Sequence, residues 1–256
     1  MARCLPALAA ALVLGACGDH EAPSPVEAPG QSRSSTDLML EAGASALQGK
    51  APLQAMSLYL DGFHFYSGHM NGQMEAHHYC SRLNDEVSQC VIYDGNRADA
   101  KIMGVEYIVS RRLFEGLPDA EKALWHSHVH EVKSGQLVAP GVPDVAETAL
   151  MEDLVDTYGK TFHTWHTDQD KELPVGVPQL MMGFTADGQL RPELLKERDE
   201  RLGIDSTRKR ASRESLPLPP IAEGADAWQR GPPLQITDPT GRGRHPSEAG
   251  AGYAPR

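Results

Sequence analysis

The chain has 256 residues, of which 40% are hydrophobic and 23% charged, a composition typical of a soluble globular protein with one large or two small domains. Its formal net charge of −11 argues against nucleic acid as a partner, because nucleic-acid binders present clustered excess lysine and arginine. No apolar run reaches the roughly 18 residues that a membrane-spanning helix needs.

Residues 1–16 have the pattern of a signal peptide. A short positive start at Arg3 precedes a run made almost entirely of alanine, leucine and valine. The run ends in Leu14-Gly15-Ala16-Cys17, which resembles the lipobox of bacterial lipoproteins. The resemblance implies cleavage before Cys17, acylation of that residue by chains such as palmitate, and membrane lipid as a partner. An ordinary secretory signal with a chance cysteine is the alternative.

The predicted lipid anchor implies a cellular location and determines how many cysteines remain in the mature chain. Because Gly18 rather than aspartate follows Cys17, we expect a lipid-anchored protein of the cell envelope, on the periplasmic side of the outer membrane. Cys4 would leave with the signal. Only Cys80 and Cys90 then remain, in a compartment that permits disulfides.

Two biased stretches flank the expected domain. Residues 17–35 are rich in proline, alanine, serine and glutamate, and we expect them to form a flexible tether after the lipidated cysteine. Residues 36–205 carry the apolar periodicity of a folded domain. Residues 206–256 are dense in proline, glycine and arginine, so we expect a disordered tail.

Two helices are predicted at the start of the domain. Serine and threonine precede a helical apolar rhythm near Thr36, where the first helix should begin. Leu53, Met56, Leu60 and Phe63 follow at three- and four-residue spacing, which predicts a second helix leading up to Phe63.

A β-hairpin is predicted next. Residues 76–83 and 87–93 are β-prone runs separated by Asn84-Asp85-Glu86. A turn centred on Asp85 places Cys80 directly opposite Cys90, and we favour a disulfide there over two packed thiols. A register slip by one residue would send the two cysteines to opposite faces.

The remaining elements follow without regular β-α alternation. Extended segments are expected at residues 101–109, 131–138 and 161–167, and residues 180–184 form a further apolar segment. Helices are expected at residues 118–124, 144–159 and 192–202. This order predicts an α+β fold, a mainly antiparallel sheet with flanking helices in a single domain.

Nine of the eleven histidines lie between His64 and His166, and the densest run is His126-Ser127-His128-Val129-His130-Glu131. If this run is extended, all three imidazoles share one face. They could then bind a divalent transition metal such as Zn²⁺, Fe²⁺ or Cu²⁺, with Glu131 completing the ligand set. If the run is helical, only His126 and His130 share a face.

A second histidine pair could contribute one more ligand. His77 and His78 are adjacent, so a strand sends them to opposite faces, and at most one can join His126 and His128. Cys80 shares a face with His78 and could ligate a metal if it is not in a disulfide.

Several observations favour less specific interpretations. An isolated histidine is more often a hydrogen-bonded or solvent-facing side chain than a ligand, and this applies singly to His64, His163 and His166. The sequence contains no Gly-x-Ser-x-Gly elbow, Walker loop, Gly-x-Gly-x-x-Gly or His-Glu-x-x-His motif. No enzymatic reaction is therefore indicated by a motif.

Eight short segments stand in order along the chain: Phe63-His64-Phe65-Tyr66-Ser67, His77-His78-Tyr79-Cys80, Gln89-Cys90-Val91-Ile92-Tyr93-Asp94, Gly104-Val105-Glu106-Tyr107-Ile108-Val109-Ser110, Leu124-Trp125-His126-Ser127-His128, Glu131-Val132-Lys133-Ser134-Gly135, Tyr158-Gly159-Lys160 and Arg191-Pro192-Glu193-Leu194. Together they resemble the plant oil-body-associated proteins and their microbial relatives, a domain of unknown function. The resemblance covers residues 36–202. It implies a family whose plant members associate with seed lipid droplets and for which no reaction is established.

The resemblance also sorts the candidate residues. It includes positions equivalent to His64, His77, His78, Cys80, Cys90, Trp125, His126, His128 and Glu131. His130 and His166 fall where relatives carry other residues, which weakens a three-histidine site on one strand. The family's plant members keep both cysteines inside a reducing cell, so metal ligation or packing stays open for them.

Two classes of function follow. The leading hypothesis is a membrane-anchored lipoprotein carrying an oil-body-associated-type domain, with a lipid-surface or scaffolding role and unspecified protein partners. The alternative is a metal-dependent enzyme or a metal-binding module that uses His126 and His128 with His77, His78 or His64.

Overall fold

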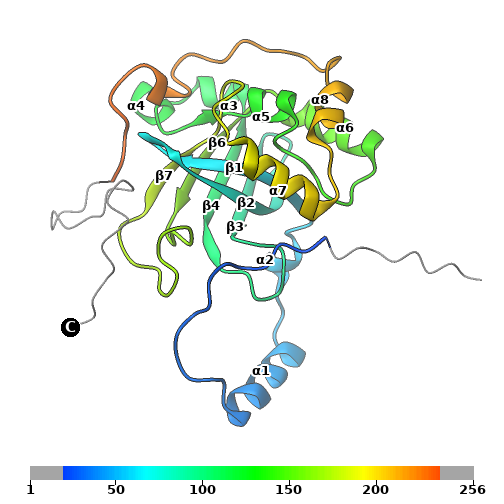
Figure 1. Ribbon diagram of the computed structural model, residues 1–256, viewed down its shortest axis with the longest axis vertical. Coiled ribbons are helices and arrows are strands. Elements are labelled where there is room, and N and C mark those ends of the chain that lie inside the picture. The colour runs from blue at the N-terminus through cyan, green and yellow to red at the C-terminus, as the bar shows by residue number, and fades with distance from the viewer. Residues whose placement is uncertain (1–19, 237–256) are drawn as a thin grey trace, which may run out of the picture.

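The computed structural model describes residues 20–236 (Figure 1). The expected signal peptide, Cys17 and residues 237–256 lie outside the described residues. Among residues 20–236, no helix combines the length and the apolar character needed to cross a membrane.

The helices are α1 (Ser35–Leu47), α2 (Ala51–Gln54), α3 (Arg111–Glu115), α4 (Asp119–Lys122), α5 (Val129–Ser134), α6 (Asp144–Leu154), α7 (Pro192–Leu202), α8 (Ser206–Ser212) and the 3-10 turn η1 (Ala227–Gln229). The strands are β1 (Leu58–Tyr66), β2 (His69–Asn84), β3 (Val87–Tyr93), β4 (Ile102–Ser110), β5 (His126–Ser127), β6 (Thr157–His163) and β7 (Gln179–Met182).

The strands form one antiparallel sheet that closes on itself. Its order within the described part of the chain is β4-β3-β2-β1-β7-β6-β5, and β4 also pairs with β6. Strands β1, β2, β3, β4, β6 and β7 therefore make a closed barrel, and β5 adds two residues along β6. The predicted α+β fold with a mainly antiparallel sheet in a single domain is confirmed.

The strand registers arrange the inward-facing residues in rings. One ring holds Leu60, His78, Ile92, Gly104 and His163. The next ring holds Cys80, Cys90, Glu106, Thr161 and Met181. Because strand residues two apart share a face, the polar members of both rings point into the same interior.

Helices cover one end and one side of this barrel. Figure 1 shows α3, α4, α5, α6 and α8 gathered at one end, while α7 lies across β1 and β2. Phe63 and Phe65, on the outer face of β1, pack in one cluster with Leu194 and Leu195 of α7. Strand β1 is consequently buried on both faces from Leu60 onwards.

The predicted second helix is wrong. Only α2 forms there, and β1 begins at Leu58. The spacing of Leu60 and Phe63 also suits a strand whose two faces are both buried, and β1 pairs with β2 over its whole length. The predicted helix over 144–159 likewise ends at Leu154, and β6 starts at Thr157.

Part of the expected tether docks on the domain. Ala22 and Val26 are each 4% exposed. The Ala22 N–H donates to Oδ1 of Asn96 at 2.7 Å, and the Ser24 hydroxyl donates to Oδ2 of Asp94 at 2.7 Å. The expectation of a free tether over 17–35 therefore fails for residues 20–26. Helix α1 is different, since none of its residues is buried.

Residues 206–236 also pack on the domain, although the sequence predicts a disordered tail from residue 206. The buried Arg213 guanidinium donates to the carbonyls of Val132 and Leu137 at 2.8 and 2.7 Å. Farther along, Oδ1 of Asp226 accepts from the Ser127 N–H at 3.1 Å. The segment is held by polar side chains. The prediction of disorder relied on its low content of aliphatic residues and therefore did not account for these contacts. The last segment of the expected tail, 237–256, is outside the described residues.

Candidate metal centre

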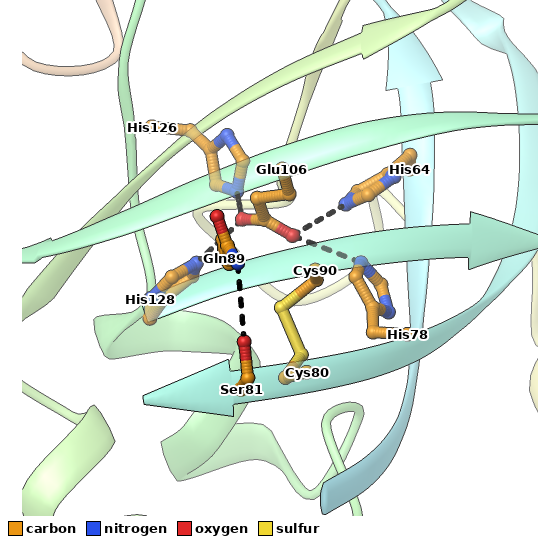
Figure 2. The surroundings of a disulfide bond; sticks show 9 residues. All are labelled: His64, His78, Cys80, Ser81, Gln89, Cys90, Glu106, His126 and His128. Atoms are coloured by element: carbon orange, nitrogen blue, oxygen red, sulfur yellow. Dashed lines mark hydrogen bonds and ion pairs between the residues drawn. A yellow bond between two sulfur atoms is a disulfide. The ribbon is translucent and has the colours of Figure 1, made fainter. Parts of the chain in front are cut away.

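A buried carboxylate, Glu106 of β4, lies among four imidazoles inside the barrel (Figure 2). Its Oε2 is 2.9 Å from Nε2 of His78 and 4.0 Å from Nε2 of His64. Its Oε1 is 3.2 Å from Nε2 of His128 and 3.4 Å from Nε2 of His126. All five residues are at most 4% exposed. Ring nitrogens from four parts of the chain thus meet on one carboxylate away from solvent.

Strand periodicity places three of these residues. His78 on β2 and Glu106 on β4 belong to the two rings described above. His64 on β1 lies four residues after Leu60 and therefore points inward as well. His163 on β6 shares this face, and its Nε2 lies 3.4 Å from Nδ1 of His64. The barrel wall therefore supplies the carboxylate and three imidazoles of the centre.

The other two imidazoles come from the segment that covers the barrel end. His126 lies on β5, and His128 caps the N-terminus of α5. The run from His126 to His130 begins as a strand and continues as a helix. Neither of the two predicted alternatives, a fully extended run or a fully helical run, is therefore correct. The strand predicted at 131–138 is wrong for the same reason, because α5 runs to Ser134. The helix turns His130 away, to within 4.0 Å of Asp187 near the surface.

Glu131 of α5 adds a second carboxylate. Its Oε2 lies 3.8 Å from Nε2 of His126. Two sets of ligand atoms then lie within 4.8 Å of one another, His64 with Glu106 and His126, and His126 with His128 and Glu131. Each set is two histidines and one carboxylate, and His126 belongs to both.

Two glycines leave room around these ligand atoms. A Cβ on Gly159 of β6 would lie 2.0 Å from Oε1 of Glu106 and 2.8 Å from Nε2 of both His126 and His128. A Cβ on Gly183 would lie 2.7 Å from Oε2 of Glu131. Any side chain at either position would enter the space where the ligand atoms converge.

The hydrogen bonds of His128 assign its tautomer. The Thr157 hydroxyl donates to the Leu154 carbonyl at 2.7 Å, so its oxygen accepts from Nδ1–H of His128 at 2.8 Å. Nε2 of His128 then presents a lone pair to Oε1 of Glu106. Two lone pairs at 3.2 Å repel each other unless a cation, either a proton or a metal ion, lies between them.

The ionisation of the centre follows from burial and these contacts. Burial acts to raise the pKa of Glu106, but the imidazoles of His126, His128 and His78 around it outweigh burial and hold that pKa well below its usual range. Burial, with the charge of Glu106, raises the pKa of Glu131 well above its usual range. Burial also lowers the pKa of His126. The carboxylate anion of Glu106 therefore lies beside two side chains, His126 and Glu131, that burial keeps neutral.

The remaining histidines of this part of the chain differ in whether they reach the centre. Burial lowers the pKa of His64 well below its usual value and that of His163 to about 3. His166 is buried elsewhere, where its Nε2 meets the Val177 carbonyl at 3.2 Å. His64 and His163 thus belong to the centre, while His130 and His166 do not reach it.

His77 points to the opposite face of β2, as the alternation of a strand predicts. Its Nδ1 lies 3.1 Å from Oδ2 of Asp61, and its Nε2 lies 3.4 Å from Oε1 of Glu75. Arg198 and Arg201 of α7 pair with these two carboxylates. Burial and the charge of Asp61 raise the pKa of Glu75 to about 7. Because arginines already neutralise both acids, this outer cluster is poorly suited to a metal ion.

Sequence reasoning missed Glu106 and His163 as members of the centre. Glu106 had a usable signal, since it is the one charged residue in the nine-residue strand Ile102–Ser110. A lone charge on one face of an apolar strand indicates a buried group that needs partners. His163 had no comparable signal, because its neighbour across the barrel, His64, is 99 residues away.

The predicted disulfide is present. Cys80 pairs with Cys90 across the β2–β3 ladder with a Cα–Cα distance of 4.0 Å, in the register the sequence predicts. Both residues face the barrel interior beside the centre (Figure 2).

Comparison with known proteins places the chain among relatives. A family profile described as "Protein of unknown function (DUF1264)" matches residues 50–217. Oil body-associated protein 1B of Arabidopsis thaliana is 44% identical over 201 residues, 77% of this chain and 83% of the relative. Oil body-associated protein 1A of Zea mays is 45% identical over 194 residues, 76% of this chain and 82% of the relative. No solved structure matches the chain.

These relatives contradict the cellular location that was expected from the sequence. Oil body-associated protein 2A of Zea mays, 40% identical over 206 residues, carries the same description as the two above. All three are plant proteins named for oil bodies. The expected location in a cell envelope, on the periplasmic side of an outer membrane, is contradicted by them.

The family match covers all strands of the barrel and every residue of the centre, from His64 on β1 to His163 on β6. The curated relatives extend over more than three quarters of the chain at about 40–45% identity. The chain therefore belongs to the oil body-associated proteins, a family that shares a domain of unknown function.

Proposed function

We propose that the barrel interior binds one divalent transition metal ion through His126, Glu106 and the imidazoles around them. The contact between Nε2 of His128 and Oε1 of Glu106 carries this proposal. The tautomer of His128 leaves two lone pairs facing each other, and a cation between them removes the repulsion. Among residues 20–236, neither ring nitrogen of His126 has a hydrogen-bond partner, although the residue is fully buried.

The donor set suits a transition metal. Imidazole nitrogen and carboxylate oxygen are the donors that Zn²⁺, Fe²⁺ and Cu²⁺ accept. His64, Glu106 and His126 offer two histidines and one carboxylate, the set that also holds non-haem iron. The Thr157 hydroxyl holds Nδ1 of His128, as outer partners commonly do for a ligating histidine.

Charge supports the same proposal. Glu106 is an anion in a fully buried site, and burial keeps His64 and His126 neutral at neutral pH. An isolated buried anion is costly, and a divalent cation would offset that cost. On binding, Glu131 would lose its proton and supply a second negative charge.

The burial of the centre favours binding over turnover. Each of the six residues His64, His78, Glu106, His126, His128 and Glu131 is at most 4% exposed. A substrate would need an opening in the barrel end to reach the ion. We therefore propose a metal-binding module, with a metalloenzyme as the less favoured form of the same site.

The test is the metal content of the purified full chain. Mass spectrometry of the eluted metal should find close to one ion per chain, and it should identify that ion. The double variant His126→Ala/His128→Ala and the near-isosteric Glu106→Gln should both lose it. His166→Ala is the matched control, because His166 is also buried and lies outside the centre. Metal-free wild type that also fails to bind added Zn²⁺, Fe²⁺ or Cu²⁺ would contradict the proposal.

A second candidate function is attachment to a lipid surface through α1. The helix has no buried residue, and Met39 and Leu47 are 70% and 88% exposed. Leu38 and Leu40 are exposed as well. Exposed apolar side chains grouped on one helix are typical of an interaction surface, and the relatives are named for oil bodies.

Flotation with phospholipid-coated triacylglycerol droplets tests this second function. Wild type should float with the droplets, and Leu38→Asp/Leu47→Asp should remain in solution. Leu218→Asp is the control, since Leu218 is 73% exposed but lies outside α1. Equal flotation of all three proteins would show that α1 is not the attachment surface.

A further inference from the structure

The disulfide lies beside the ligand cluster rather than at the surface. Cys80 follows His78 by two residues on the same inward face of β2. Cys90 pairs directly with Glu106 across the β3–β4 ladder. Figure 2 shows the disulfide together with the side chains of these two neighbours, His78 and Glu106. Two of the residues proposed to meet the ion are thus the immediate neighbours of two cysteines.

The Cys80–Cys90 disulfide lies between an apolar cluster and the polar centre of the barrel. Cys80 and Cys90 are 2% and 3% exposed and pack with an apolar cluster that includes Leu60 and Ile108. On their other side lie His78 and Glu106, which carry the polar centre. A disulfide in this position is apolar and offers no strong ligand. A dithiol in the same position would offer two.

We propose that reduction of the Cys80–Cys90 disulfide creates a second ligand set, in which both thiolates bind the ion together with His78 and Glu106. The inference rests on the proposed metal-binding function of the barrel centre. The disulfide form offers only nitrogen and oxygen donors, whereas the dithiol form adds two soft sulfur donors. The chain would therefore bind thiophilic ions such as Zn²⁺ more tightly when reduced.

The geometry of the pair suits shared ligation. The two Cα atoms are 4.0 Å apart on facing strands, so both sulfur atoms must occupy the same small region. Thiolates bound to one tetrahedral Zn²⁺ at about 2.3 Å stand roughly 3.8 Å apart. Facing cysteines can open to that separation by side-chain rotation, without a change of strand register.

The redox step balances with a low-molecular-weight thiol as reductant. Two such thiols give up two electrons and two protons and become their own disulfide. The Cys80–Cys90 bond breaks, and each sulfur gains one electron and one proton. When the divalent ion binds, the two thiol protons pass to solvent, and the two thiolates together with Glu106 place three negative charges around the ion.

Cobalt titration of the full chain tests the inference, because a thiolate bound to Co²⁺ gives a charge-transfer band in the near ultraviolet that nitrogen and oxygen ligands do not. One sample is oxidised, and the other is reduced with a phosphine under nitrogen. Reduced wild type should show the band at one Co²⁺ per chain and bind at least tenfold more tightly than the oxidised sample. Cys80→Ser/Cys90→Ser should bind without the band and be insensitive to the phosphine.

The outcomes separate this inference from the proposed function. If the oxidised chain binds Co²⁺ but reduction adds neither the band nor affinity, the thiolate set is excluded and the metal-binding function stands. If the oxidised chain binds nothing but the reduced chain binds with the band, the histidine and carboxylate set alone is not a metal site. A disulfide that resists the phosphine in the folded chain, shown by no mass gain on alkylation, would also overturn the inference.

Discussion

Gly159 of β6 lies so close to Glu106 of β4 that a single added methyl group would meet the carboxylate, at 2.0 Å from its Oε1. The same group would lie 2.8 Å from Nε2 of both His126 and His128. The backbone of Gly159 needs no left-handed conformation, so the requirement for glycine is one of space. The position where β6 passes the centre is therefore tied to the ligand cluster rather than to a turn.

Gly159→Ala should abolish metal binding and lower stability. The methyl group would displace Glu106 or the two imidazoles, and overpacking of this kind costs about 1–3 kcal/mol. Metal content and urea unfolding of the full chain measure the two effects. Gly43→Ala is the control, since no atom of the described part of the chain lies within 4 Å of a Cβ built there. Full metal content in Gly159→Ala would show that the ion does not sit at this point.

His77→Ala and His78→Ala should differ in metal content although the two residues are adjacent and both buried. His78 faces Glu106, whereas His77 faces Asp61 on the other side of β2. Both variants should lose stability, because each leaves a buried carboxylate with one partner fewer. Only His78→Ala should weaken metal binding, measured as the Zn²⁺ affinity of the full chain. Equal affinities would remove His78 from the proposed ligand set.

The opposite orientation of His77 and His78 is also a feature that the sequence predicts correctly. The two-residue period of a strand requires His77 and His78 to separate, and a turn centred on Asp85 requires Cys80 to face Cys90. The helix Pro192–Leu202 follows from a proline start and a charged amphipathic pattern. The strand alternation, the hairpin register and the helix start each depend on residues that are close together in the sequence. Rules for local secondary structure are therefore sufficient to predict them.

The barrel itself could not be predicted in the same way. Its closure depends on the pairing of β4 with β6, which brings Glu106 opposite Thr161 and Gly104 opposite His163. No local pattern indicates which distant strands pair. The change from strand to helix at His128 was hidden as well, because it depends on packing against the barrel end. The sequence therefore predicted part of the proposed ligand set, but it did not predict Glu106 at the centre of that set.

Asp226→Asn should stabilise the protein at neutral pH and above. Burial raises the pKa of Asp226 to about 7, against weaker opposing effects of the Ser127 N–H and Arg230. The folded state thus binds a proton that the unfolded state releases near pH 4, so wild-type stability falls as pH rises from about 4 to about 7. Asparagine keeps the acceptor for Ser127 and never ionises.

The gain from Asp226→Asn should be on the order of 2–4 kcal/mol above pH 7 and should vanish toward pH 4. Thermal unfolding of both proteins across this range provides the measurement. Asp119→Asn, at an exposed acid on α4, is the control and should give no such pH-dependent gap. A gain that is constant across the range would rule out ionisation of Asp226 as its cause.

Arg198→Met should destabilise the fold strongly at neutral pH. The guanidinium is fully buried, donates to Oδ1 of Asp61 at 2.6 Å and to the Gln136 carbonyl at 3.0 Å, and so ties α7 to β1. Burial acts to raise the pKa of Asp61, but His77 and Arg198 outweigh it and hold it at about 2. Loss of the arginine leaves a buried anion and should cost about 3–5 kcal/mol in urea unfolding.

Acid should narrow the gap between Arg198→Met and wild type. A depressed carboxyl pKa stabilises the fold above the unfolded value near 4, and that contribution is lost as pH falls toward 2. The variant lacks most of this contribution at any pH, so the difference in stability between the two proteins should narrow progressively as pH falls from about 5 toward 2. Asp61→Asn added to Arg198→Met should recover part of the loss at pH 7, because the stranded charge is gone. No recovery in the double variant would mean that the lost carbonyl contacts of Arg198, rather than its pairing with Asp61, account for the destabilisation.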